Sequence, residues 1–167
     1  KQVKRSGWWK INIRDPENVA EHSHRCAIVG YFLSKMENAN TEKVITMCLF
    51  HDLPEARLTD LHKVADRYLD IKKAEKHAFE EQLDNLPPEM KKDLLGIFSK
   101  NEKDLSKESI VVRDADLIEC ALQAKEYIDL GHKEAISWIN NIRKLLKTKS
   151  AKKLLKEFAD YLVKRKI

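Results

Sequence analysis

Residues that reverse the chain direction are scarce in this sequence, and their scarcity limits the possible folds more than any other feature. The 167 residues include only 4 glycines and 4 prolines, about 5 per cent of the chain against roughly 12 per cent in average proteins. β-Sandwiches and barrels need many turns, which are rich in these two residues. With 43% apolar and 35% charged residues, the chain is also too apolar to be disordered. The composition therefore predicts an all-α fold of long amphipathic helices.

Apolar side chains recur every three or four residues along most of the chain, the spacing of a helix with one buried face. Thr41 and Ser106 are expected as N-caps, while Pro54 and Gly131 are expected to end the helices before them. Since no repeat, linker or boundary is visible, we expect a single domain over residues 1–167. The pattern predicts helices over 17–37, 41–53, 72–86, 88–99, 106–130, 133–147 and 150–165.

Charge and cysteine content bear on the partners and the compartment. The net charge is +5, which gives weak support to an anionic partner. Cys26, Cys48 and Cys120 show no paired spacing, so we expect free thiols in a reducing compartment. No stretch approaches the ~18 apolar residues of a membrane span, and none resembles a signal peptide. We therefore expect a cytoplasmic protein that does not associate with membranes.

Four polar side chains that can bind metals lie in or beside otherwise apolar helices: His22, His51, Asp52 and Asp116. The adjacent His51 and Asp52 follow a buried helix, where neighbours about 100° apart can converge on an ion beyond the last turn. Asp116 lies in a strongly apolar run, and a buried carboxylate needs a partner. Taken alone, His22 could be a hydrogen-bonded core histidine, and Asp116 could pair with Arg113.

Two imidazoles and two carboxylates predict a particular class of metal site. Such a donor set leaves octahedral positions open, so Mn²⁺, Co²⁺, Fe²⁺, Ni²⁺ or Mg²⁺ is favoured over a soft metal. An ion of this class polarises a phosphoryl group and lowers the pKa of a bound water. Glu55, three residues after Asp52, is near enough to transfer the proton. It could instead stabilise the start of a helix after Pro54.

The order of these residues resembles the HD-domain metal-dependent phosphohydrolases, whose pattern is a histidine, a later histidine-aspartate doublet and a distant aspartate. Four stretches are similar, more narrowly, to the HD-domain 5′-deoxynucleotidases of the YfbR and HDDC2 type: Arg5-Ser6-Gly7-Trp8, Glu17-Asn18-Val19-Ala20-Glu21-His22-Ser23, His51-Asp52-Leu53-Pro54-Glu55 and Thr59-Asp60. The similarity covers nearly the whole chain. It implies an HD-domain helical bundle that hydrolyses a nucleoside 5′-monophosphate, above all a deoxyribonucleotide, and that forms a homodimer.

The resemblance also implies a role for each matching residue. The implied metal ligands are His22, His51, Asp52 and Asp116, and the implied acid or base beside the metal is Glu55. Arg5 and Trp8 would bind the substrate, and Asp60 would contact the deoxyribose.

The chain departs from the family pattern at two places. Thr59 stands where the family often has glycine, which could alter the turn before Asp60. The spacing between the arginine, the tryptophan and His22 differs among subfamilies, so Arg14 could compete with Arg5 for the phosphate. On the residues alone, Trp8 could equally be a packing residue, and Asp60 could cap a short helix.

Two other functions are compatible with the sequence. An HD phosphohydrolase could act on another phosphorylated metabolite or on a nucleotide signal. A non-catalytic basic helical module would bind nucleic acid, with steep salt dependence and no turnover. The lysine-rich final helices lack an interleaved aromatic pattern and a clear recognition helix. We therefore favour the enzyme and do not expect nucleic acid as a partner.

Overall fold

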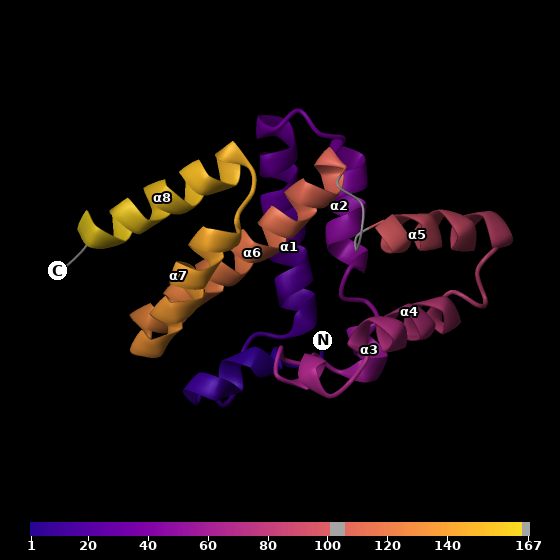
Figure 1. The fold of residues 1–167 in the computed structure, drawn as a ribbon, viewed down its shortest axis with the longest axis horizontal. Helices are drawn as coiled ribbons and strands as arrows, with labels where there is room; N and C mark the ends of the chain where they lie inside the picture. The colour runs from indigo at the N-terminus through magenta and orange to yellow at the C-terminus, as the bar shows by residue number, and fades with distance from the viewer. Residues whose placement is uncertain (101–105, 165–167) are drawn as a thin grey trace. The chain divides into compact units, whose positions relative to one another are not determined.

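The computed structural model describes residues 1–100 and 106–164, and its regular structure is helical (Figure 1). Over these residues the only extended pairing is an isolated antiparallel bridge between Lys4 and Asn18, which confirms the all-α prediction. No helix in this part of the chain is long and apolar enough to cross a bilayer. The elements are η1 Ser6–Ile11, α1 Val19–Met36, α2 Thr41–Phe50, α3 Glu55–Leu58, η2 Ala65–Arg67, α4 Ile71–Gln82, α5 Pro88–Lys100, α6 Lys107–Asp129, η3 Lys133–Ala135, α7 Ile136–Leu145 and α8 Lys149–Lys164.

The first two long helices begin at side-chain caps. Asn18 Oδ1 accepts a hydrogen bond from Glu21 N at 3.0 Å, and Glu21 Oε2 accepts one from Asn18 N at 2.8 Å, so a reciprocal capping box starts α1. At α2 the predicted cap was wrong by one residue, because Asn40 Oδ1 accepts from Lys43 N at 3.0 Å. Asparagine caps at least as well as threonine. The Thr41 hydroxyl instead accepts from Ser34 Oγ.

The other helices follow the predicted pattern, with differences at their ends. Ser106 caps α6 through its hydroxyl, which accepts from Ser109 N at 3.3 Å, and Gly131 follows the helix with φ +104°, as predicted. α2 ends at Phe50 rather than at 53, and the predicted start of the 133–147 helix is the separate short helix η3. The last residue of the predicted helix 150–165 lies outside the described residues.

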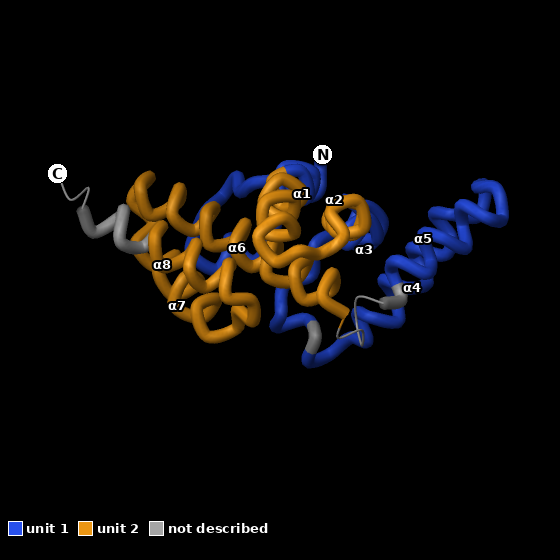
Figure 2. The backbone as a smooth tube through the Cα atoms, turned by 90° about the horizontal axis from the view of Figure 1, so that it is seen from above, with its two compact units in different colours: residues 1–24, 49–104 blue, residues 25–48, 105–167 orange. Residues whose placement is uncertain are grey.

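The chain forms two compact units, each assembled from two separate segments (Figure 2). Unit 1 comprises Lys1–His24 and Leu49–Asp104, and unit 2 comprises Arg25–Cys48 and Leu105–Ile167. Their boundaries fall inside α1 and α2, where the sequence shows no linker. The single domain over residues 1–167 stays a prediction.

In unit 1, hydrogen bonds hold the N-terminal segment against the start of α1. Arg5 N donates to Glu17 O at 3.0 Å, and Val19 N donates to Val3 O at 3.0 Å. The buried indole of Trp8 donates through Nε1 to Glu17 Oε1 at 3.1 Å. These bonds fix the stretch that contains Arg5, a predicted site residue.

Unit 2 is organised around α6, the longest helix, which contacts η3, α7 and α8. α1 and α2 pack closely in this unit, since a Cβ added to Gly30 would lie 2.8 Å from Cys48 Sγ and 3.1 Å from Val44 Cγ1. Cys26 and Cys48 are fully buried and form no disulfide. They therefore act as core residues, as the apolar stripes indicate.

Candidate functional site

The adjacent His51 and Asp52 lie in the tight turn between α2 and α3. Glu55 N donates to Asp52 O at 3.1 Å, and the following Pro54 disfavours continuation of α2, because proline restricts the residue before it. The turn leaves both side chains half-buried. It thus places an imidazole and a carboxylate at the end of a helix, as the sequence predicted.

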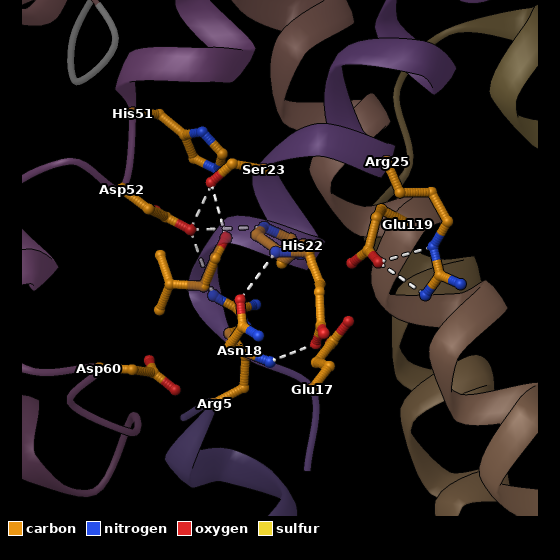
Figure 3. Close-up of polar contacts among 12 residues, drawn as sticks. Arg5, Glu17, Asn18, His22, Ser23, Arg25, His51, Asp52, Asp60 and Glu119 are labelled. Carbon is orange, nitrogen blue, oxygen red and sulfur yellow. Dashed lines mark hydrogen bonds and ion pairs between the residues drawn. The ribbon is translucent and has the colours of Figure 1, made fainter. Parts of the chain in front are cut away.

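His22 of α1 points toward these two residues (Figure 3). Its side chain is fully buried. His22 Nε2 lies 3.4 Å from Asp52 Oδ2, and His51 Nε2 lies 3.3 Å from the same oxygen. One donor atom from each of the three residues lies within 4.8 Å of the others. Unit 1 therefore brings together three of the four predicted metal ligands, the ligand cluster His22, His51 and Asp52.

The ligand cluster fits a divalent cation by its donor chemistry. Imidazole nitrogen and carboxylate oxygen together suit first-row divalent ions, and three protein ligands leave positions open for water and substrate. Both histidines direct Nε2 at one carboxylate oxygen, so the donor atoms already converge on a small volume.

Asp116, the fourth predicted ligand, is half-buried on α6 in unit 2, and its role as a ligand stays a prediction. The fully buried carboxylate of this apolar run is Asp114. It accepts hydrogen bonds from Lys147 N at 3.0 Å and from Thr148 N at 2.6 Å, and a third from Thr148 Oγ1 at 2.7 Å. Asp114 therefore holds the start of α8, a role that the sequence did not reveal.

Glu55 begins α3 with its carboxyl turned into the protein. Its Oε2 is buried and has no hydrogen-bond partner within the described residues. Burial above all, and then the negative charges of Asp52 and Asp60, raise the pKa of Glu55 to about 9, while Arg5 and His22 oppose the rise. A carboxyl with this pKa holds its proton at neutral pH. Glu55 is thus the first residue of α3 and also a carboxyl that interacts with the charges of the ligand cluster.

Arg5 contacts the ligand cluster directly. Its Nη1 lies 3.3 Å from Asp52 Oδ2, and its backbone is held by Glu17. Arg14, the competing candidate for the phosphate, is exposed. The contact with Asp52 favours Arg5 for a role at this site.

Asp60 joins the loop after α3 to the N-terminal segment. Its Oδ2 accepts from Ser6 N at 2.5 Å, so the carboxylate sits at the start of η1, which is distant in sequence. Thr59, before it, adopts φ +64° and ψ 163°, a region that suits glycine and strains a β-branched residue. Thr59 therefore adopts a backbone conformation that glycine, the residue often found here in the family, takes without strain.

Trp8 is only 2% exposed, and its indole N–H is satisfied by Glu17. This environment is that of a packing residue, the second of the two interpretations of Trp8. Its contact with substrate stays a prediction.

A pocket of about 280 Å³ opens beside Asp52 within unit 1. Its walls come from the first residues of the chain, one side of α1 and the turn after α2, and they are mostly apolar. The lining residues are Lys1, Val3, Val19, Ala20, Ser23, His24, Leu49, Asp52, Leu53 and Ala56. This pocket could not be predicted from the sequence, because its residues come from three separate stretches.

A polar network in unit 2 was also missed. Arg25 of α1 donates through Nε to the fully buried Glu119 at 2.9 Å (Figure 3). Through Nη2 it donates to Gln123 at 2.6 Å. Its Nη1 reaches Glu126 at 2.7 Å. The three acceptors on α6 are spaced by four and three residues, the one sequence signal that could have shown a shared partner.

The comparisons with known proteins assign the family. Residues 1–159 match the family model for an HD domain. The chain belongs to the HD-domain family. Membership in this family implies divalent metal binding, which agrees with the ligand cluster.

Named relatives of this HD domain are 5′-deoxynucleotidases. The human 5′-deoxynucleotidase HDDC2 is 34% identical over 138 residues, which cover 80% of this chain and 65% of the human protein. The Dictyostelium discoideum protein of the same name is 32% identical over 141 residues, covering 79% of this chain and 74% of that protein. The chain thus spans about two thirds of the length of the curated relatives.

Solved structures agree with the fold of this HD domain. A conserved hypothetical protein from Pyrococcus furiosus is 29% identical with a TM-score of 0.75, covering 94% of this chain and 91% of that chain. A protein from Pyrococcus horikoshii is 26% identical with a TM-score of 0.79, over 94% of this chain and 91% of that one. The HD-domain helical bundle expected from the sequence is confirmed.

Proposed function

We propose that the protein is a metal-dependent phosphoric monoester hydrolase that releases phosphate from nucleoside 5′-monophosphates, deoxyribonucleotides above all. The observation that carries the proposal is the ligand cluster with the buried Glu55 oxygen Oε2 near it, which has no hydrogen-bond partner among the described residues. The names of the relatives supply the substrate class. Asp116 completes the proposed ligand set, and the ion is Mn²⁺, Co²⁺, Fe²⁺, Ni²⁺ or Mg²⁺.

Each residue of the site has a proposed task. When bound, the ion supplies positive charge that polarises the phosphoryl group and makes a water molecule more acidic. Arg5 offers a planar fork to the phosphate oxygens. Glu55, which holds its proton at neutral pH, donates it to the 5′ oxygen of the leaving nucleoside as that phosphorus–oxygen bond breaks. A water molecule forms the new bond to phosphorus and releases a proton to solvent, which gives inorganic phosphate and the nucleoside.

The remaining proposed contacts are with the base and the sugar of the substrate. The pocket beside Asp52 has apolar walls that suit a nucleobase. Trp8 is proposed to contact the substrate and Asp60 to accept a hydrogen bond from the deoxyribose 3′-hydroxyl, although its carboxylate also holds Ser6 N. A pocket packed around C2′ would leave an added 2′-hydroxyl crowded or unpaired, a cost of roughly 1 to 3 kcal/mol.

The same proposal extends to assembly and location. We expect a cytoplasmic homodimer without a nucleic-acid partner. The alternative enzyme, an HD phosphohydrolase of another phosphorylated metabolite or nucleotide signal, would use the same ligand cluster and differ only in the substrate pocket. The other alternative, a basic module that binds nucleic acid, would show no turnover.

A substrate panel tests this function. The purified protein is assayed for phosphate release from matched deoxy- and ribonucleoside 5′-monophosphates with each of the five ions. We expect hydrolysis that depends on the ion, with kcat/KM for the deoxy form about 5- to 150-fold higher. Asp60→Ala should lower that ratio, whereas Asp60→Asn keeps an oxygen for Ser6 N and serves as the control for loop position. Equal values in the parent protein contradict the deoxyribose preference, and an absence of hydrolysis with every ion contradicts the function.

A further inference from the structure

The hydroxyl group of Ser6 is buried and unsatisfied. Ser6 is 5% exposed, and its Oγ has no hydrogen-bond partner among the residues that the structure describes. Such a hydroxyl costs stability, because it has lost its hydrogen bonds to water. A serine hydroxyl can donate one hydrogen bond and accept others. The Ser6 hydroxyl is therefore available for a hydrogen bond to a ligand.

Ser6 lies among residues of the candidate site in unit 1. The preceding Arg5 has its Nη1 3.3 Å from Asp52 Oδ2. The backbone N of Ser6 donates to Asp60 Oδ2 at 2.5 Å. Since the N and Oγ atoms of one serine are at most about 3.7 Å apart, Ser6 Oγ lies within about 6 Å of that Asp60 oxygen. Arg5 and Asp60 are half-buried, so solvent and a ligand can reach the edge of this group.

We propose that the Ser6 hydroxyl binds the substrate by donating a hydrogen bond to the 3′-hydroxyl oxygen of the sugar. The inference rests on the proposed function, in which the 3′-hydroxyl donates its own proton to Asp60. A hydroxyl group can accept from one neighbour while it donates to another. Two such bonds, each with about 2.7 Å between its oxygens, span up to about 5.4 Å. This span fits the short distance between Ser6 Oγ and Asp60.

The contact makes Ser6 a specificity residue for the 3′-hydroxyl. Deoxyribonucleotides and ribonucleotides both carry this group, so Ser6 acts on both alike. A 2′,3′-dideoxynucleotide lacks it and leaves the polar groups of Ser6 and Asp60 without their partner. A site built to bind a substrate hydroxyl rejects an analogue without that hydroxyl, because its own buried polar groups are then unpaired.

The test compares two substrates that differ only at C3′. Phosphate release from deoxyadenosine 5′-monophosphate and 2′,3′-dideoxyadenosine 5′-monophosphate is measured with the full chain and the ion that supports the fastest turnover. Ser6→Ala should lower kcat/KM for the deoxy substrate about 3- to 10-fold, the effect of one hydrogen bond. It should leave kcat/KM for the dideoxy substrate within about twofold. The variant keeps the backbone N of residue 6, so Asp60 retains its hydrogen bond.

Ser34→Ala is the matched control. Ser34 is also fully buried, but its hydroxyl donates to Tyr31 O at 2.7 Å. Its replacement should lower Tm by about 3 °C and leave the kcat/KM ratio of the two substrates within about twofold. Ser6→Ala removes a hydroxyl without a partner among the described residues, so it should not lower Tm. This opposite pattern separates a binding role from a structural one.

Two results overturn the proposal while the proposed hydrolysis stands. An equal loss with both substrates would assign the Ser6 hydroxyl to a part of the substrate other than C3′. An unchanged kcat/KM for the deoxy substrate would show that the hydroxyl does not bind the substrate. An absence of hydrolysis by the parent chain contradicts the proposed function itself, and this inference with it.

Discussion

Buried carboxylates in the two units have opposite surroundings. In unit 2, Asp114 accepts hydrogen bonds from Lys147 and Thr148, and Glu119 is paired with Arg25 at 2.7 Å. In unit 1, the Glu55 oxygen Oε2 is buried without a hydrogen-bond partner among the described residues. A satisfied buried carboxylate stabilises the fold, whereas an unsatisfied one costs stability and persists where function needs it. The comparison therefore distinguishes buried carboxylates that stabilise the fold from the one that we propose to act in hydrolysis.

The largest expected effect is on turnover at the unsatisfied carboxylate. Glu55→Ala should slow nucleotide hydrolysis by roughly 10²- to 10⁴-fold, the range for positioned acid–base catalysis. Metal affinity, measured by calorimetry with Mn²⁺, should change little, because Glu55 is not a proposed ligand. Full turnover at saturating substrate would reassign Glu55 to helix stabilisation.

Two aspartates on α6 should separate stability from metal binding. Asp114→Ala leaves the backbone N–H groups of Lys147 and Thr148 without their acceptor, so the free energy of unfolding should fall by about 3 kcal/mol. Asp116→Ala, two residues later, should lose metal affinity with a change in stability under about 1 kcal/mol. Urea denaturation and metal titration of both variants check the pair, and the reverse pattern would exchange the two roles.

Glu55 should also make the free energy of unfolding of the metal-free protein depend on pH. Its pKa in the folded state is about 9, above the ordinary value of 4.5. Between these pH values the unfolded chain has released the proton and the folded chain keeps it, so this group lowers the free energy of unfolding as pH rises. Glu55→Gln removes that cost and should stabilise the protein by at least about 1 kcal/mol at pH 8, or roughly 3 °C in Tm.

At pH 4.5 the gain from Glu55→Gln should nearly vanish, since the folded state then holds the proton and the unfolded chain holds it about half of the time. The exposed Glu157→Gln is the matched control and should show no such difference between the two pH values. Thermal melts in excess chelator check this, and a gain that does not depend on pH would mean that charge is not its cause.

The smallest expected effect concerns the turn between Glu55 and Asp60. Thr59 holds φ +64°, so Thr59→Gly should release strain and raise stability by up to about 1 kcal/mol after the entropy cost of glycine. Asn38 has φ 53°, but asparagine tolerates this region. Asn38→Gly should therefore change Tm by less, and an equal shift in both variants would remove strain as the explanation.

The sequence predicted those features that depend on local pattern. Apolar spacing located the long helices, and Ser106 and Gly131 marked the ends of α6. It also singled out His22, His51 and Asp52, which come together in unit 1. These residues stand out because polar groups in apolar helices need a partner.

Features that depend on contacts between distant segments could not be predicted. Asp114 and Asp116 lie in the same apolar run, and only the folded chain shows that Asp114 is buried against Thr148. Likewise, Asp60 meets Ser6 across 54 residues, a pairing that leaves no periodic signal. A sequence shows which residues are unusual for their surroundings, and the fold determines which groups form hydrogen bonds or ion pairs with them.

The central claim is that His22, His51, Asp52 and Asp116 hold one divalent ion. A crystal structure of the full chain with Mn²⁺, with the ion located by its anomalous scattering, tests this most directly. We predict a single ion per chain with a nitrogen or oxygen donor from each of the four residues at roughly 2.0 to 2.4 Å. An ion bound elsewhere would contradict the account. So would any two of these side chains lying more than ~10 Å apart in the loaded protein, because ligands of one ion at such distances cannot span that gap.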